Sequence, residues 1–211
     1  WKNSSYKKDK IFNMVYHRLL LVGTKKKVLG VQRFLTLQGD EGPITHLAHI
    51  PNTKKFVAAN PAGKIILHDL GAASQQGISL GKGDSAISAL AVCPLGKYIA
   101  VGAQNGTLCL FSTKNGTLES STAAHNGPVH ALAFSADGRH LASGGADGIM
   151  KIRKLAPGPE MTTSIKEGGA IRAITYTTTG QNLVTGSEDG SVRLWDSNGK
   201  ECTRIIEAHA M

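Results

Sequence analysis

The sequence lacks the features that mark membrane-spanning and secreted chains. Aromatic residues are few, and no apolar run in the 211 residues approaches the roughly 18 that a transmembrane helix needs. No secretory signal is visible, because the N-terminus is polar and basic through Lys10. We therefore expect an intracellular protein, in the cytoplasm or the nucleus, that is neither secreted nor inserted into a membrane.

Cysteine is also scarce, which argues against a disulfide framework and a zinc site. Cys93, Cys109 and Cys202 are scattered, odd in number and without any C-x-x-C spacing, as is typical of a reducing compartment. His46 and His49 are candidate metal ligands by residue type, but residues three apart on an extended strand point to opposite faces, so they cannot bind one ion together. We expect neither a metal ion nor a cofactor.

Positive charge is concentrated near the N-terminus. Residues 1–40 carry nine Lys and Arg against two Asp, whereas residues 41–211 carry fifteen against thirteen acidic residues. Such a cluster can hold phosphate or an acidic partner, although a solvated arm and a Lys-rich turn are the simpler interpretation. The candidate basic patch consists of Lys7, Lys8, Lys10, Lys25, Lys26 and Lys27.

The stretch from Leu183 to Asp196 predicts a β-hairpin. Its two ends are rich in apolar and β-branched residues, and the turn between them contains Asp189-Gly190. Asp-Gly between two such runs is a strong hairpin signal, because the turn needs a positive φ that glycine adopts easily.

The same pattern recurs along the chain. Gly186 has equivalents at Gly144, Gly102 and Ala59, about 42 residues apart, and a short alternating apolar stretch precedes each copy. Four copies at this period are typical of the four-stranded blades of a β-propeller. The turn Asp189-Gly190 corresponds to Asp147-Gly148, Asn105-Gly106 and Ala62-Gly63.

The hairpin ends in Trp195-Asp196, and with its repeats the chain resembles the WD40-repeat family from about residue 40 to 209, and more weakly from residue 11. The resemblance implies an all-β propeller with about five blades, four clear and one degenerate, that forms part of a larger ring. The expected organisation is a basic arm at 1–10, a degenerate first blade at 11–39, and repeats at 40–82, 83–124, 125–166 and 167–209, forming one propeller domain or a fragment of one.

The resemblance also implies a buried chain of hydrogen bonds in each blade, from a His through a Ser or Thr to a Trp, with an Asp in the turn. One repeat has His125, Ser143 and Asp147, with Arg153 in place of Trp. The next repeat has Thr185, Asp189 and Trp195, with Glu167 in place of His. The two earlier repeats lack this set, so we expect them to rely on apolar packing.

His125, Ser143 and Asp147 are also the residue types of a hydrolase triad. Their positions recur in part as Thr185 and Asp189, and no G-x-S-x-G elbow is present. We therefore interpret them as structural, and expect no enzyme activity and no small-molecule substrate.

The family resemblance places a partner-binding face on the rim of loops at one end of the blades. Arg172 is the first candidate, since arginine is enriched among interface hot spots. The expected function is a non-enzymatic scaffold that mediates protein–protein interactions within a multi-subunit assembly. The alternative is a nucleic-acid-associated module, in a ribonucleoprotein or its assembly machinery, that uses the basic N-terminal segment. The candidate face comprises Arg172, His130, Glu188, Gln104, Thr45 and Ser88.

Overall fold

The computed structural model describes residues 43–71, 77–82, 85–155 and 162–207. The chain divides into two units, Trp1–Pro43 and Ile44–Met211, and the description below concerns the second. The predicted arm at 1–10, the predicted blade at 11–39 and all six lysines of the candidate basic patch lie outside the described residues. Within the described part, the protein has no helix of the length and apolar character needed to cross a bilayer.

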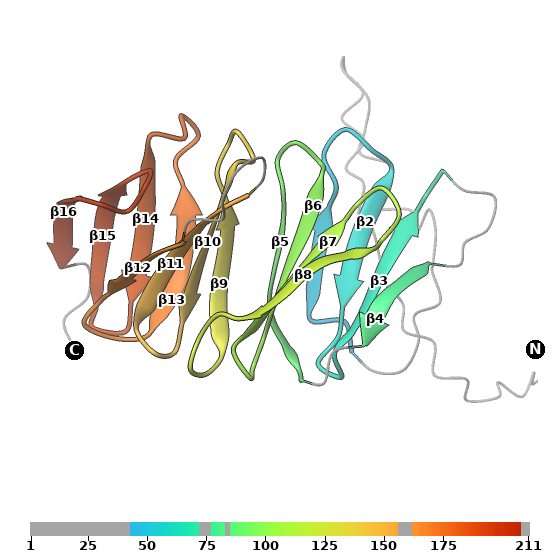
Figure 1. The fold of residues 1–211 in the computed structure, drawn as a ribbon, viewed down its shortest axis with the longest axis horizontal. Coiled ribbons are helices and arrows are strands. Elements are labelled where there is room, and N and C mark those ends of the chain that lie inside the picture. The colour runs from blue at the N-terminus through green and yellow to red at the C-terminus, as the bar shows by residue number, and fades with distance from the viewer. Residues whose placement is uncertain (1–42, 72–76, 83–84, 156–161, 208–211) are drawn as a thin grey trace, which may run out of the picture. The chain divides into compact units, whose positions relative to one another are not determined.

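The described residues confirm the all-β prediction. Sixteen strands form four antiparallel sheets of four strands each, and the strands of each sheet pair in chain order. The sheets follow one another across the view of Figure 1, from the first on the right to the fourth on the left. The first strands of consecutive sheets contact each other, β1 with β5, β5 with β9, and β9 with β13.

The strands have the following bounds. The first sheet holds β1 (His46–His49), β2 (Lys55–Ala59), β3 (Lys64–Asp69) and β4 (Ile78–Lys82), and the second holds β5 (Ile87–Val92), β6 (Tyr98–Ala103), β7 (Thr107–Ser112) and β8 (Leu118–Ala123). The third sheet holds β9 (Val129–Phe134), β10 (His140–Gly145), β11 (Ile149–Lys154) and β12 (Thr162–Lys166), and the fourth holds β13 (Ile171–Tyr176), β14 (Asn182–Ser187), β15 (Ser191–Asp196) and β16 (Cys202–Glu207).

The predicted hairpin at 183–196 is confirmed as β14 and β15. Leu183 pairs with Trp195, and Thr185 pairs with Arg193. Gly190 closes the turn with a φ of 79°, in the left-handed region that favours glycine. The equivalent glycines of the other three sheets, Gly63, Gly106 and Gly148, have φ values of 81°, 85° and 69°.

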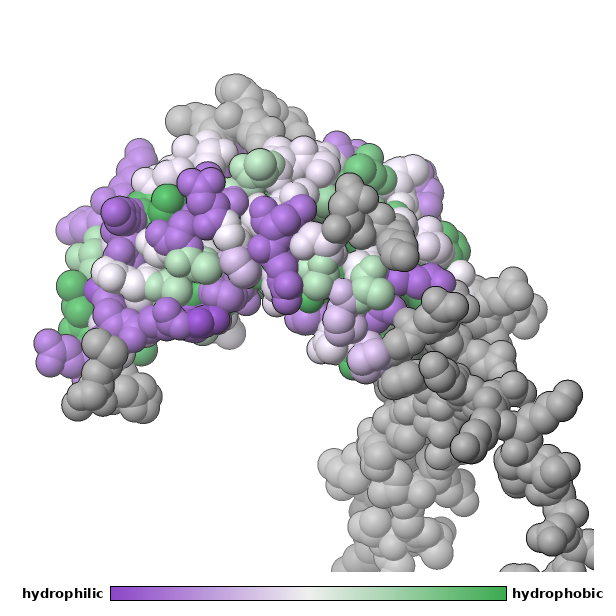
Figure 2. All heavy atoms as spheres, turned by 90° about the horizontal axis from the view of Figure 1, so that it is seen from below, coloured by the Kyte–Doolittle hydropathy of each residue, from purple (hydrophilic) through white to green (hydrophobic). Residues whose placement is uncertain are grey.

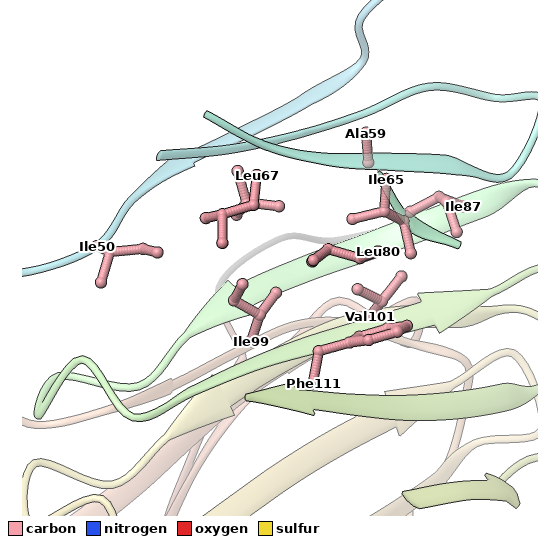
Figure 3. Packing of buried hydrophobic residues seen from close by; sticks show 10 residues of the cluster. Ile50, Ala59, Ile65, Leu67, Leu80, Ile87, Ile99, Val101 and Phe111 are labelled. Carbon is pink, nitrogen blue, oxygen red and sulfur yellow. The ribbon is translucent and has the colours of Figure 1, made fainter. Parts of the chain in front are cut away.

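The core lies between consecutive sheets, because each sheet presents apolar side chains on both of its faces. On β6, Ile99 and Val101 pack against the first sheet, whereas Ala100 between them packs against the third. This is the alternation that a strand buried on both sides requires. Figure 3 shows the first of these layers, with Ile65 and Leu67 facing Ile99 and Val101.

The apolar layer between the first two sheets should be sensitive to a cavity, which would lower the free energy of unfolding. Ile99 is completely buried, so Ile99→Ala should lower the free energy of unfolding by about 2–5 kcal/mol. Leu118 on β8 is 54% exposed, and Leu118→Ala should change it by no more than about 0.5 kcal/mol. Denaturant unfolding of both variants checks this expectation. Equal losses would show that the layer does not carry the stability.

Candidate functional site

The third sheet contains the predicted hydrogen-bonded chain. His125 lies before β9, and its Nε2 is 2.8 Å from the Ser143 hydroxyl on β10. Its Nδ1 is 3.0 Å from Asp147 Oδ1 in the turn that follows. The backbone N–H groups of Asn126 and Ile149 donate to the same carboxylate, at 3.0 and 3.1 Å. Both imidazole nitrogens and the carboxylate are therefore satisfied within the sheet.

Burial and hydrogen bonding together determine the protonation states of His125 and Asp147. Burial is the main effect on His125. It lowers the pKa of His125 below its ordinary value of 6.5, and the opposing effect of Asp147 does not cancel the shift. For Asp147, burial alone would raise the pKa, but the donors Asn126, Ile149 and His125 hold it below its ordinary value. The neutral imidazole therefore donates from Nδ1 to an ionised Asp147 and accepts from Ser143.

The geometry resembles a hydrolase triad, but it faces the interior. Ser143 is 2% exposed and His125 is 5% exposed. A substrate cannot reach the Ser143 hydroxyl while the sheet is folded. The arrangement instead ties the loop before β9 to the turn after β10, and such a buried, satisfied network makes a sheet rigid.

The fourth sheet contains part of the same series of buried hydrogen bonds. The Trp195 indole N–H donates to the Thr185 hydroxyl at 3.0 Å, and both residues are buried. In the third sheet, the half-buried Arg153 occupies the position of Trp195. The fourth sheet thus keeps the Trp–Thr end of the chain, and the third keeps the Ser–His–Asp end.

Glu167 takes the place of the histidine in the fourth sheet, and Arg193 on β15 makes this possible. The Glu167 side chain is wholly buried, and Arg193 Nη1 donates to its Oε2 at 3.0 Å. Arg193 Nη2 donates to Asp189 Oδ2 at 2.6 Å. Hydrogen bonds from Arg193 and Ser191 lower the pKa of Asp189 far below its ordinary value. One guanidinium therefore compensates two carboxylates.

The interpretation of the sequence missed Arg193. Two differences between the third and fourth repeats could have indicated it. The fourth repeat has Glu167 where the third has His125, and Arg193 where the third has Lys151. Lys151 lies close enough to His125 to lower its pKa further. A carboxylate in place of a neutral imidazole requires a nearby cation, and arginine is the side chain that can serve two carboxylates at once.

The first two sheets bury a ring at the position of Trp195, His68 in the first and Phe111 in the second, and their residues at the position of His125, Asp40 and Gly83, lie outside the described residues. In the first sheet, His68 stacks on Phe56 with ring centroids 4.8 Å apart, and burial lowers the His68 pKa. In the second sheet, Phe111 belongs to the apolar cluster. No group of three or more potential metal ligands occurs among the described residues. His46 instead bonds Thr45, and His49 bonds the Thr53 carbonyl.

A β-bulge interrupts the first strand of three sheets at the same position. The pairing shifts by one residue at Ser88 on β5, at His130 on β9 and at Arg172 on β13. A bulged residue is left out of the regular ladder, and bulges commonly redirect a side chain at the edge of a site. Three of the six predicted rim residues are therefore bulge residues.

The structure brings together His130, Arg172 and Glu188, which we call the rim cluster. Arg172 Nε donates to Glu188 Oε1 at 2.7 Å, and Arg172 Nη1 lies 2.9 Å from His130 Nε2. Burial, and then the charge of Arg172, lower the His130 pKa, which leaves the imidazole neutral and able to accept. The Arg172 and Glu188 side chains are 54% and 48% exposed.

The other predicted rim residues do not join the cluster. The Ser88 hydroxyl donates to the Val129 carbonyl at 2.7 Å and so links the second and third sheets. The Thr45 hydroxyl bonds its neighbour His46. Gln104 is exposed, and its backbone N–H donates to the Ala86 carbonyl. The Ser88 hydroxyl is thus already used in the contact between the second and third sheets.

Removing Arg193 should destabilise the fourth sheet. Arg193→Met leaves the buried Glu167 without its cation, and we expect the free energy of unfolding to fall by about 3–5 kcal/mol. The double change Glu167→His and Arg193→Lys reproduces the pair His125 and Lys151 of the third sheet, and should lose less. Denaturant unfolding measures both. A double variant less stable than Arg193→Met would contradict this account.

The protein should lose stability as the pH falls through the histidine range. His125 has a folded pKa below 6.5, so the unfolded chain binds the proton first, and the contribution present above 6.5 is lost on acidification. We expect the free energy of unfolding to decrease between about pH 7.5 and about pH 5.5. His125→Gln should flatten this slope, with His68 and His130 supplying the remainder. Equal slopes in both proteins would contradict the assignment.

The WD domain, G-beta repeat family matches the chain at residues 76–112, 116–153 and 160–196. Each match begins at the last strand of one sheet and continues through three strands of the next; the first match, for example, spans β4 and β5–β7. None of the curated proteins compared matches the chain. The three family matches cover more than half of the sequence, and the chain therefore belongs to the WD40-repeat family.

Proposed function

We propose that this protein is a non-enzymatic scaffold that holds other proteins within a multi-subunit assembly, and that a partner docks on the rim cluster. WD40 repeats generally mediate protein–protein interactions as scaffolds. The observation that carries the proposal is the exposed group of His130, Arg172 and Glu188, which two neighbouring sheets hold together.

The backbone of the rim cluster is fixed while its side chains remain accessible. His130 and Arg172 are bulge residues of β9 and β13, and these strands contact each other. The backbone beneath the cluster therefore needs no ordering when a partner binds, which reduces the entropy lost on association. Arginine is also among the residues that most often dominate interface energies.

The ion pair between Arg172 and Glu188 costs little to rearrange. Exposed pairs of this kind contribute about 0–1 kcal/mol to stability, and both side chains are about half exposed. A carboxylate on a partner can take the place of Glu188 on the Arg172 guanidinium without loss of the fold. The cluster therefore suits a partner segment that carries Asp or Glu.

A nucleic-acid-associated function is the second candidate, and the charge of the N-terminal segment supports it. Residues 1–40 carry nine basic against two acidic residues. Binding to RNA or DNA through these lysines would weaken steeply with salt and disappear on deletion of residues 1–27. A protein partner retained at high salt would favour the scaffold.

Substitution of Arg172 should remove the partner without unfolding the protein. Arg172→Ala eliminates the guanidinium at the centre of the rim cluster, and we expect partner affinity to fall by at least about tenfold, or 1.4 kcal/mol. Affinity capture with quantitative mass spectrometry identifies the proteins bound by the unaltered chain, and titration of one of them measures the loss.

Arg139 supplies the matched control. It lies in the turn between β9 and β10, at the opposite end of the sheet, and its side chain is 75% exposed. Arg139→Ala should retain the full set of partners, and both variants should unfold within about 0.5 kcal/mol of the unaltered protein. Equal capture by the two variants would remove the rim cluster from the proposal.

A further inference from the structure

Asparagine is followed directly by glycine at several turns and loops of the described sheets. In such a pair the backbone nitrogen of the glycine can attack the asparagine side-chain amide, because glycine has no Cβ that hinders the approach. The attack requires the glycine N–H to lose its proton and the nitrogen to move toward the asparagine Cγ. The pairs are Asn105-Gly106, Asn115-Gly116, Asn126-Gly127 and Asn198-Gly199.

In three of these pairs a backbone carbonyl holds the glycine N–H. A hydrogen-bonded N–H gives up its proton only when the turn opens, so the nitrogen of each of these glycines is protected in the folded protein. The bonds run from Gly106 to Ala103 at 3.1 Å, from Gly116 to Ser112 at 2.9 Å and from Gly199 to Asp196 at 2.9 Å.

Two of the asparagine side chains are held as well. Asn105 Oδ1 accepts from the Thr107 N–H at 3.1 Å. Asn115 Oδ1 accepts from the Thr117 N–H at 3.3 Å and from the Thr117 hydroxyl at 2.9 Å. Each of these two pairs must therefore break at least two hydrogen bonds before the attack can occur.

The pair Asn126-Gly127, in the loop between β8 and β9, has neither restraint. Among the described residues, none accepts a hydrogen bond from the Gly127 N–H and none bonds the Asn126 side chain. Asn126 is exposed and Gly127 is partly exposed. The loop lies at the lower end of the sheets in Figure 1, and Figure 2 shows hydrophilic (purple) and pale atoms over much of that end. Water and hydroxide can therefore reach both residues.

We propose that Asn126 is a site of spontaneous covalent modification, and that it deamidates before the other three asparagines. Hydroxide removes the Gly127 N–H proton, and the nitrogen forms a bond to Asn126 Cγ. The bond from Cγ to the amide nitrogen breaks, and ammonia leaves with a proton from water, which restores the hydroxide. Water then opens the cyclic succinimide at either carbonyl. The products are aspartate, or isoaspartate in which the backbone runs through the former side chain.

The modification should loosen the loop that leads into the third sheet. The Asn126 N–H donates to Asp147 Oδ2 at 3.0 Å, and the Ala146 N–H donates to the Pro128 carbonyl at 2.9 Å. Isoaspartate inserts an extra backbone carbon between these two points of attachment. It also places a new carboxylate on the residue whose N–H binds Asp147, where like charges repel. This consequence does not depend on the proposed scaffold function.

The relative rates at the four pairs test the proposal. The 211-residue chain is incubated in mildly alkaline buffer and digested in acid, which stops the reaction, and mass spectrometry follows the mass increase at each asparagine. Asn126 should react at least about tenfold faster than Asn105 and Asn115, with Asn198 between them because only its glycine is held. In denaturant the four rates should converge. Equal rates in the folded protein, or an unchanged order in denaturant, would overturn the proposal.

Two variants separate the modification from its consequence. Asn126→Gln should leave the denaturation midpoint unchanged and prevent the early gain of negative charge that anion exchange detects. An early gain that persists in this variant would place the reaction elsewhere and overturn the proposal. The isoaspartyl form isolated from the aged protein should unfold at lower denaturant than Asn126→Gln, and Asn126→Asp measures the share due to charge alone. An isoaspartyl form as stable as Asn126→Gln would contradict the loosening of the loop.

Discussion

The structure depends on one constraint, namely that each four-stranded sheet has two apolar faces and can bury them only against neighbouring sheets. Ile99 and Ala100 are adjacent on β6 and both are completely buried, one under the first sheet and the other under the third. A sheet alone would leave one of these layers in water. Stability therefore arises between sheets rather than within them, as in other repeat proteins where each unit contacts only its neighbours.

The buried polar groups reinforce this arrangement in two chemically different ways. In the third sheet a neutral His125 connects Ser143 to Asp147. In the fourth sheet Arg193 holds the buried Glu167 and Asp189. Both solutions tie the loop that enters the sheet to the tight turn between its second and third strands. We expect the arrangement with His125 to weaken in mild acid, whereas the arrangement in the fourth sheet depends on Arg193, which stands where the third sheet has Lys151.

The predictable parts of the fold are those set by local chemistry. The hairpin at 183–196 could be identified because Asp189-Gly190 fixes the turn and the apolar residues around it alternate. Arg193 was missed because it acts across 26 residues on Glu167, and its signal appears only when two matched positions, His125 with Glu167 and Lys151 with Arg193, are compared together. The bulges at Ser88, His130 and Arg172 were missed because a shift of one residue in pairing leaves no mark in the alternation of apolar residues.

At those bulges, the backbone conformation is independent of the side chain that the surface displays. The backbone at positions 88, 130 and 172 departs from the ladder in the same way, although the side chains are a hydroxyl, an imidazole and a guanidinium. The departure therefore does not depend on which side chain stands there. Repeats of this kind can exchange the chemistry they display, one position at a time, while the backbone hydrogen bonds of the strand ladders stay in place.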